Sequence, residues 1–272
     1  MGRLEFLKKT APTILAQSEL NFCLVDYSCP DRAGEWFRSH FADAIREGRA
    51  TVVDVLGRPY FEKSKALNAG GREALLRGAE YVGFLDGDTL LKSGFGSWLV
   101  EHVRSDRFII AGSSPDGYDV HCLMGLVIIP SAQYAACGGY DEEMVGWGGE
   151  DIEMRLRLHV LHKLRYRRVP FEFLDYIDHG DELRVKHHIL SMSESNRRNL
   201  ERTRDRVRQW TGRDMYLLGT AARRLIWWPQ GSNCLSDGSQ IWRLDLRLSL
   251  VRRLRKVERQ RLGGASGPYT RG

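Results

Sequence analysis

The stretch Tyr81-Val-Gly-Phe-Leu-Asp-Gly-Asp88 places a short apolar run directly before two carboxylates. An apolar run of this length that ends in a polar turn is typical of a buried strand. Gly87 lets the backbone approach a ligand closely, and carboxylates two residues apart can both reach one hard cation, which prefers oxygen ligands. The stretch therefore predicts either a cation site at a strand end or a polar turn that only closes the strand.

The chain before this stretch alternates between predicted helices and strands. The predicted helices cover residues 3–18, 33–47 and 64–77, and the predicted strands cover residues 21–26, 50–55 and 81–85. Pro12 predicts a kink or a break in the first helix. Strand–helix alternation is typical of a mostly parallel, Rossmann-like sheet with flanking helices, and ligands of such sheets bind at the carboxyl ends of the strands. We therefore expect an α/β fold with its site at Asp86 and Asp88.

A glycine-rich loop, Gly146-Trp-Gly-Gly-Glu-Asp151, leads into a predicted helix over residues 151–161. A carboxylate there could act as a general base toward a sugar hydroxyl, and Trp147 offers an apolar platform for a sugar face. The glycines also predict a hinge that closes over a ligand. A helix start beside a buried tryptophan would show the same pattern. Further strands are predicted over residues 108–111, 123–130 and 165–175.

A histidine could complete the cation site that the two aspartates begin. His179 lies in the later loop Tyr176–Asp181, and neutral imidazole is a common metal ligand. His187 and His188 are rival candidates, and a solvated loop histidine without a ligand role is the plain alternative. The order of a strand-end acidic pair, a Gly/Trp/acid loop and a histidine is more informative than any of the three alone.

The composition limits the class of protein. A chain of 272 residues that is 42% hydrophobic can form one large α/β domain with an extension. Five cysteines without framework spacing argue against a disulfide scaffold, and they favour a reducing compartment. No apolar run approaches the length of a membrane span. We therefore expect a cytoplasmic protein, and we allow peripheral attachment to the inner face of the membrane.

The C-terminal part of the chain is strongly basic. Residues 241–262 carry eight Arg or Lys side chains against one Asp and one Glu, with leucines at helical spacing. This pattern predicts either an amphipathic helix on an anionic membrane or a solvated helix that packs one apolar stripe on the domain. Nucleic acid is an unlikely partner because no recognised module accompanies the charge. We expect a domain over 1–190, a basic helical extension over 191–262 and a disordered tail over 263–272.

The segment Gly138–Asp151 (GGYDEEMVGWGGED) resembles the GGYDE…GWGGED segment of galactosyltransferase-type GT-A glycosyltransferases, a bacterial family 2/7-like group. With Asp86-Gly-Asp88 as the DxD motif, the resemblance spans roughly residues 2–188. It implies the GT-A nucleotide-sugar-binding fold and an inverting, Mn²⁺- or Mg²⁺-dependent enzyme. The implied reaction moves a hexose or N-acetylhexosamine, with galactose favoured, from a UDP-sugar donor to a hydroxyl of a glycan, a lipid-linked acceptor or a protein.

The resemblance also implies a role for each matched residue. Asp151 would be the catalytic base, and Asp88 and His179 would ligate the metal. The residues that would bind the nucleotide or the donor are Asp26, Lys65, Asn68, Asp86 and Asp88. The residues that would hold the sugar or the acceptor are Trp147, Gly148, Gly149 and Glu150.

One departure and two rival functions stand beside this resemblance. Family members begin with an apolar first strand and a loop that leads into the opening helix, whereas Met1 lies almost within that loop. We therefore expect the first strand to be missing, either because the sequence is truncated or its start is placed late, or because the sheet lacks this strand. The first rival is a non-catalytic relative that only binds nucleotide or carbohydrate. The second is a haloacid-dehalogenase-like phosphohydrolase with Asp86 as nucleophile. That motif has Thr or Val two residues after its second aspartate, whereas this chain has Leu90 there.

Overall fold

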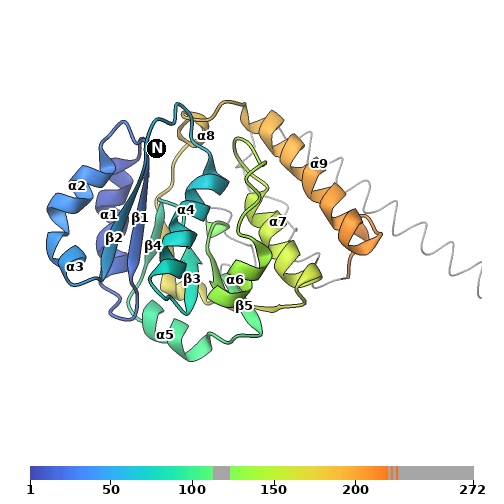
Figure 1. The fold of residues 1–272 in the computed structure, drawn as a ribbon, viewed down its shortest axis with the longest axis horizontal. Helices are drawn as coiled ribbons and strands as arrows, with labels where there is room; N and C mark the ends of the chain where they lie inside the picture. The colour runs from blue at the N-terminus through green and yellow to red at the C-terminus, as the bar shows by residue number, and fades with distance from the viewer. Residues whose placement is uncertain (113–122, 220–221, 223–224, 226–272) are drawn as a thin grey trace, which may run out of the picture. The chain divides into compact units, whose positions relative to one another are not determined.

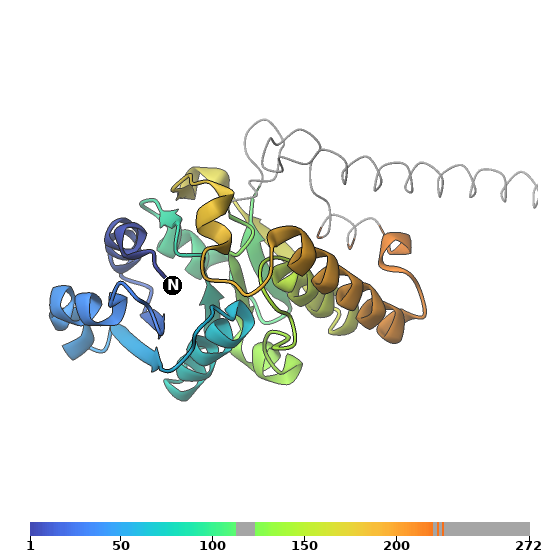
Figure 2. The same cartoon turned by 90° about the horizontal axis from the view of Figure 1, so that it is seen from above.

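The computed structural model describes residues 1–112 and 123–219, together with Ala222 and Leu225 (Figures 1 and 2). Its helices and strands follow in chain order. They are α1 (Leu4–Leu15), β1 (Phe22–Tyr27), α2 (Ala33–His40), α3 (Ala42–Arg46), β2 (Ala50–Val55), α4 (Lys63–Leu76), β3 (Tyr81–Phe84), β4 (Thr89–Leu91), α5 (Phe95–His102), β5 (Arg107–Ala111), β6 (Val127–Pro130), α6 (Ser131–Cys137), α7 (Glu150–Leu156), a π-helical turn (Arg157–Leu161), β7 (Arg165–Val169), a 3-10 turn (Phe171–Phe173), β8 (Leu174–Tyr176), α8 (Asp181–Val185), α9 (Met192–Thr211) and a 3-10 turn (Met215–Leu217).

The N-terminal layer is the parallel pair β1–β2, in register from Phe22 opposite Ala50 to Tyr27 opposite Val55. Side chains alternate between the two faces of a strand. One face of the pair packs against α1 and α2 around the buried Phe37. On the other face Val25 meets α4, where Gly70 leaves room for it. The two strands are therefore covered by helices on both sides (Figure 1).

The central sheet has the strand order β3-β6-β5-β7. Phe108 and Ile110 of β5 point into a core that α6, α7 and α9 close. Ile109, between them, points to the opposite face and packs with α5 and the end of α1. This alternation buries both faces of the sheet and leaves its strand ends as the place where polar groups can gather.

The prediction of a mostly parallel sheet is confirmed in part: β3, β5 and β7 of the central sheet run in the same direction, and β6 runs against them. Among the five strand pairings of the described residues, β1–β2 and β5–β7 are parallel, whereas β3–β6, β5–β6 and β4–β8 are antiparallel. The physical reason is that β6 is inserted between β3 and β5 and runs against both. An apolar run shows that a strand is buried on both faces, but its periodicity carries no information on strand direction.

Several predicted elements differ from the observed ones in detail. The first helix continues through Pro12 without a break. The predicted helix over 33–47 is divided into α2 and α3 at Phe41. The predicted helix over 151–161 begins at Glu150 and ends in a π-helical turn, and the predicted strand over 165–175 is interrupted by a 3-10 turn.

Residues 1–228 form one compact unit, and the predicted division into a domain over 1–190 and an extension over 191–262 stays a prediction. Helix α9 lies beside α7 (Figures 1 and 2) and sends the fully buried Val207 into the main core. Because α9 is rich in arginine, its few buried apolar residues were not recognised from the sequence. The predicted amphipathic helix over 241–262 and the predicted tail lie outside the described residues.

None of the helices described combines the length and the apolarity that crossing a membrane requires. The three cysteines within the described ranges, Cys23, Cys29 and Cys137, are free thiols.

Candidate active site

The acidic pair lies in the turn between β3 and β4, and strand pairing brings His179 to it. Thr89 of β4 pairs with Tyr176 of β8, and the Ile177 N–H donates to the Asp88 carbonyl at 2.8 Å. Two residues later, His179 Nε2 lies 2.7 Å from Asp88 Oδ2. The side chains of His179 and Asp88 are only 3% and 9% exposed. Asp88 and His179, distant in sequence, therefore form one buried contact.

The residues present fit a divalent cation at Asp88. Asp88 Oδ1 is buried and has no hydrogen-bond partner in the structure, which is costly for a carboxylate oxygen that no ligand satisfies. Burial, and then the charge of Asp86, raise the pKa of Asp88, so the site gains from a positive charge. Within the part of the chain described, no three His, Cys, Asp or Glu side chains are arranged so that they could hold a metal ion together. The protein would thus supply two ligands and leave the other positions to a bound substrate or water.

Arg3 already places a positive charge beside this contact. Its Nη1 atom lies 2.9 Å from His179 Nε2 and 3.5 Å from Asp88 Oδ2. Its Nη2 atom donates to the Leu183 carbonyl at 3.1 Å, and its guanidinium lies over the Phe6 ring. The residue that precedes α1 therefore reaches the same site as the acidic pair, a contact that the sequence pattern did not predict.

Lys63 joins the acidic pair to the glycine-rich loop. Its ammonium group lies 2.8 Å from Asp86 Oδ1 and 2.7 Å from Glu150 Oε1. Burial alone would raise the pKa of Asp86, but the charge and the hydrogen bond of Lys63, together with the charges of Arg3 and Arg184, hold that pKa below its ordinary value. A carboxylate at a strand end and a carboxylate at a helix start are thereby held on one cation.

The glycine-rich loop ends at the start of α7. Gly149 is the residue before the helix and has a left-handed φ of 91°. The first turn of α7 then carries Glu150 and Asp151, which are both buried. One oxygen of Asp151 accepts from the Ile152 N–H at 2.8 Å. Burial, and then the charge of Glu150, raise the pKa of Asp151 to about 6, which is suitable for a general base near neutral pH.

Three residues predicted to bind the nucleotide are engaged elsewhere in the structure. The Asp26 carboxylate accepts from the Cys29 and Gly34 N–H groups at 2.8 and 2.6 Å and so shapes the turn into α2. Lys65 pairs with Glu62 on its own helix. The buried Asn68 donates to the Tyr140 carbonyl at 2.9 Å and accepts from the Tyr140 N–H at 2.7 Å, so it fixes the segment ahead of the glycine-rich loop. Their predicted roles stay predictions.

The rival histidines do not join the acidic pair through any hydrogen bond among the described residues. His187 packs against Gly2, and His188 lies 5.5 Å from the Phe61 ring, measured between ring centroids. Of the three histidines considered, His179 is the one that the structure places against Asp88.

Comparisons with known proteins point to one enzyme group. Residues 116–188 match a family described as the N-terminal domain of galactosyltransferase. Validoxylamine A glucosyltransferase of Streptomyces hygroscopicus subsp. jinggangensis (strain 5008) is 54% identical over 33 residues, 12% of this chain and 8% of the relative. Mouse beta-1,4-galactosyltransferase 4 is 26% identical over 121 residues, 43% of this chain and 34% of the relative. The chain thus spans about a third or less of the curated relatives it matches.

The fold has a counterpart among solved structures. The structure of GalNAc-T7 with UDP, GalNAc and Mn²⁺ matches with a TM-score of 0.53 and 14% sequence identity, over 74% of this chain and 45% of that one. The described part of the chain therefore shares the GT-A fold of that glycosyltransferase. At this identity the likeness concerns the fold alone.

Proposed function

We propose that this chain is an inverting, metal-dependent glycosyltransferase that moves a hexose or N-acetylhexosamine, galactose favoured, from a UDP-sugar to an acceptor hydroxyl. The observation that carries the proposal is the buried Asp88–His179 contact with an unpartnered Asp88 oxygen. Lys63 forms ion pairs with both Asp86 and Glu150. It thereby connects the acidic pair to the start of α7, where Asp151 follows Glu150. The family match over 116–188 and relatives named as glycosyltransferases support the class.

Asp88 and His179 would hold Mn²⁺ or Mg²⁺, which would offset the negative charge on a departing diphosphate. Arg3 and Lys63 add positive charge around the same position. They would orient the diphosphate, and Lys63 would offset the charges of the Asp86 and Glu150 carboxylates that it holds together.

Asp151 would take the proton of the acceptor hydroxyl. The acceptor oxygen then bonds to the anomeric carbon while the bond from that carbon to the diphosphate oxygen breaks, so that UDP leaves and the configuration inverts. Because the pKa of Asp151 is raised to about 6, the group is charged at neutral pH yet basic enough to accept a proton during attack. Trp147, Gly148, Gly149 and Glu150 would bound the sugar and acceptor side, and Asp26, Lys65 and Asn68 the nucleotide side.

A donor-hydrolysis screen tests the proposal. The full chain and Asp88→Ala would be incubated with UDP-galactose, UDP-N-acetylgalactosamine, UDP-glucose and UDP-N-acetylglucosamine, with Mn²⁺ or with EDTA, and UDP release measured. We expect the wild type to release UDP from one donor, and we expect that release to vanish with EDTA and in Asp88→Ala.

Three other outcomes would contradict the proposal. Absence of UDP release, together with absence of Mn²⁺-dependent UDP binding by calorimetry, would exclude the metal site. Binding of UDP without transfer to any acceptor would favour a non-catalytic relative. Phosphatase activity without binding of any UDP-sugar would favour the phosphohydrolase reading of Asp86.

A further inference from the structure

Helix α9 contacts the glycine-rich loop through hydrogen bonds and close packing. The helix lies outside the residues that match the family, 116–188. The Trp147 N–H donates to Ser195 Oγ at 3.1 Å. One turn further along, Asn199 accepts from the Val145 N–H at 3.2 Å and donates to the carbonyls of Val145 and Gly148 at 3.2 and 2.6 Å. Both α9 side chains are buried, so these bonds replace hydrogen bonds that the irregular loop does not make within itself.

The loop glycines are required for this close approach. A Cβ atom added at Gly146 would lie 2.5 Å from the Ser195 Cβ, and one at Gly149 would lie 2.9 Å from the Asn199 Cβ. Both glycines also have left-handed φ angles, 80° and 91°, which favour glycine independently. The glycines that predicted a hinge are therefore packed directly on α9.

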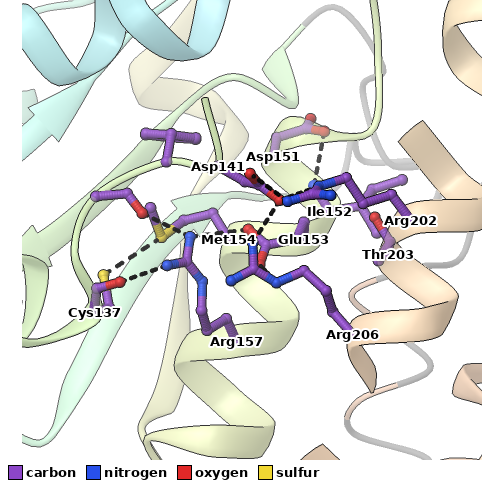
Figure 3. A network of polar contacts seen from close by, with 12 residues as sticks. Cys137, Asp141, Asp151, Ile152, Glu153, Met154, Arg157, Arg202, Thr203 and Arg206 are labelled. Carbon is purple, nitrogen blue, oxygen red and sulfur yellow. Dashed lines mark hydrogen bonds and ion pairs between the residues drawn. The ribbon is translucent and has the colours of Figure 1, made fainter. Parts of the chain in front are cut away.

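Helix α9 also forms ion pairs with Asp141, in the segment that precedes the glycine-rich loop. Arg202 Nε lies 2.6 Å and Arg206 Nη1 2.5 Å from Asp141 Oδ2. Figure 3 shows these two arginines reaching from α9 to Asp141, with Arg206 also directed at the fully buried Glu153 of α7. Charge pairs at one end and amide contacts at the other thus fix the whole segment from Asp141 to Gly149.

We infer that Asn199 is a positioning residue for the candidate base Asp151. Its amide donates to the Gly148 carbonyl, and its Cβ and backbone pack on Gly149. Gly149 is the residue at which α7 begins, so the position of this loop determines where the Asp151 carboxylate lies. The inference rests on the proposed function, because it assigns Asn199 an effect on the transfer step. A displacement of about 1 Å at a reacting group can lower a rate about 100-fold, so a side chain that touches no substrate can still control turnover.

Asn199→Ala tests the inference in the full-length chain against two matched α9 variants. Val207→Ala removes apolar contacts of the same helix from the main core without touching the loop, and Arg198→Ala changes an exposed position. We expect Asn199→Ala to lower kcat about 10- to 100-fold, with a smaller change in the KM for the UDP-sugar. We expect Val207→Ala to lower the melting temperature while retaining kcat, and Arg198→Ala to change neither.

A spectroscopic readout separates loop geometry from activity. The chain has seven tryptophans, so the 5-fluorotryptophan ¹⁹F resonance of Trp147 would be assigned with Trp147→Phe. We expect Asn199→Ala to shift or broaden this resonance and Val207→Ala to leave it in place. An unchanged Trp147 resonance in Asn199→Ala, or a kcat equal to that of Val207→Ala, would overturn the inference. If the wild type transfers no sugar at all, the proposed function fails, and the ¹⁹F comparison still decides whether Asn199 holds the loop.

Discussion

At the scale of single residues, the site is organised by cations that the sequence motifs do not contain. Lys63 lies between Asp86 and Glu150, and Arg3 lies beside Asp88 and His179. Four carboxylates gathered in a buried site would repel one another. The two cations allow the carboxylates to remain charged together.

The raised pKa of Asp151 predicts an acid limb in the pH profile of transfer. The base must be deprotonated to act, so kcat should fall as the pH drops below about 6, by about tenfold per pH unit. Because the Glu150 charge helps to raise that pKa, Glu150→Gln should move the limb to lower pH. Steady-state kinetics on both proteins would check the shift, and a limb that stays in place would remove Glu150 as its cause.

Removal of the base itself gives a second expectation at this position. Asp151→Asn should lower kcat about 10²- to 10⁴-fold while leaving Mn²⁺-dependent UDP binding close to that of the wild type. Calorimetry with UDP would establish retained binding. A variant that transfers sugar at the wild-type rate would show that another group takes the proton.

A substitution at Gly125 tests whether the position of the Asp86 carboxylate affects nucleotide binding, without changing either aspartate. A Cβ at Gly125 would lie 2.1 Å from Asp86 Oδ2, so Gly125→Ala must displace that carboxylate. We expect Mn²⁺-dependent UDP binding to weaken about tenfold, which corresponds to about 1.4 kcal/mol. Gly83→Ala is the matched control, because its Cβ would meet Ile128 at an ordinary 3.5 Å. Equal UDP affinity in the two variants would mean that the position of Asp86 has no effect on the nucleotide.

At the scale of elements, α7 and α9 are joined by charges as well as by apolar contacts. Glu153 of α7 is fully buried and lies 2.9 Å from Arg157, in the π-helical turn after α7, and 3.6 Å from Arg206 of α9. A buried ion pair contributes little by itself, but loss of one partner leaves the other charge uncompensated. The packing of the two helices therefore depends on complete pairing within this small network.

Glu153→Gln should destabilise the fold substantially. It keeps the shape of the side chain while leaving Arg157 without its buried counter-charge, and we expect a loss of about 3 kcal/mol in the free energy of unfolding. Arg197→Ala, which breaks the exposed pair with Glu201 on α9, should cost less than about 1 kcal/mol. Urea unfolding of both variants would measure the difference, and similar losses would show that the buried pair has no special weight.

At the scale of the whole molecule, the sequence predicted most strands and one contact of the candidate site. Apolar runs located nearly every strand, and the order of DxD, GWGGED and His179 located the contact that forms when β4 pairs with β8. Strand direction could not be predicted, because burial on both faces looks alike in parallel and antiparallel strands. Lys63, Arg3 and Asn199 were missed because single polar residues in helical segments carry no spacing signal.

The basic C-terminal segment gives a prediction at the same scale. If residues 241–262 form an amphipathic helix on anionic lipid, the full chain should sediment with vesicles that contain phosphatidylserine or phosphatidylglycerol, and high salt should reduce this binding. A chain that ends at residue 228, the limit of the compact unit, should stay in solution. Equal behaviour of the two chains would favour the solvated helix.

The contacts between α9 and the glycine-rich loop also limit the design of chimaeric enzymes. Consider a chimaera in which only the segment from Asp141 to Asp151 is replaced by that of another enzyme. The new loop would have evolved to pack on a different helix, and Ser195 and Asn199 would lose their hydrogen-bond partners in the loop. If the loop binds the sugar as we propose, a change of specificity would require the loop together with α9. A graft designed to change the sugar should carry both pieces as one module.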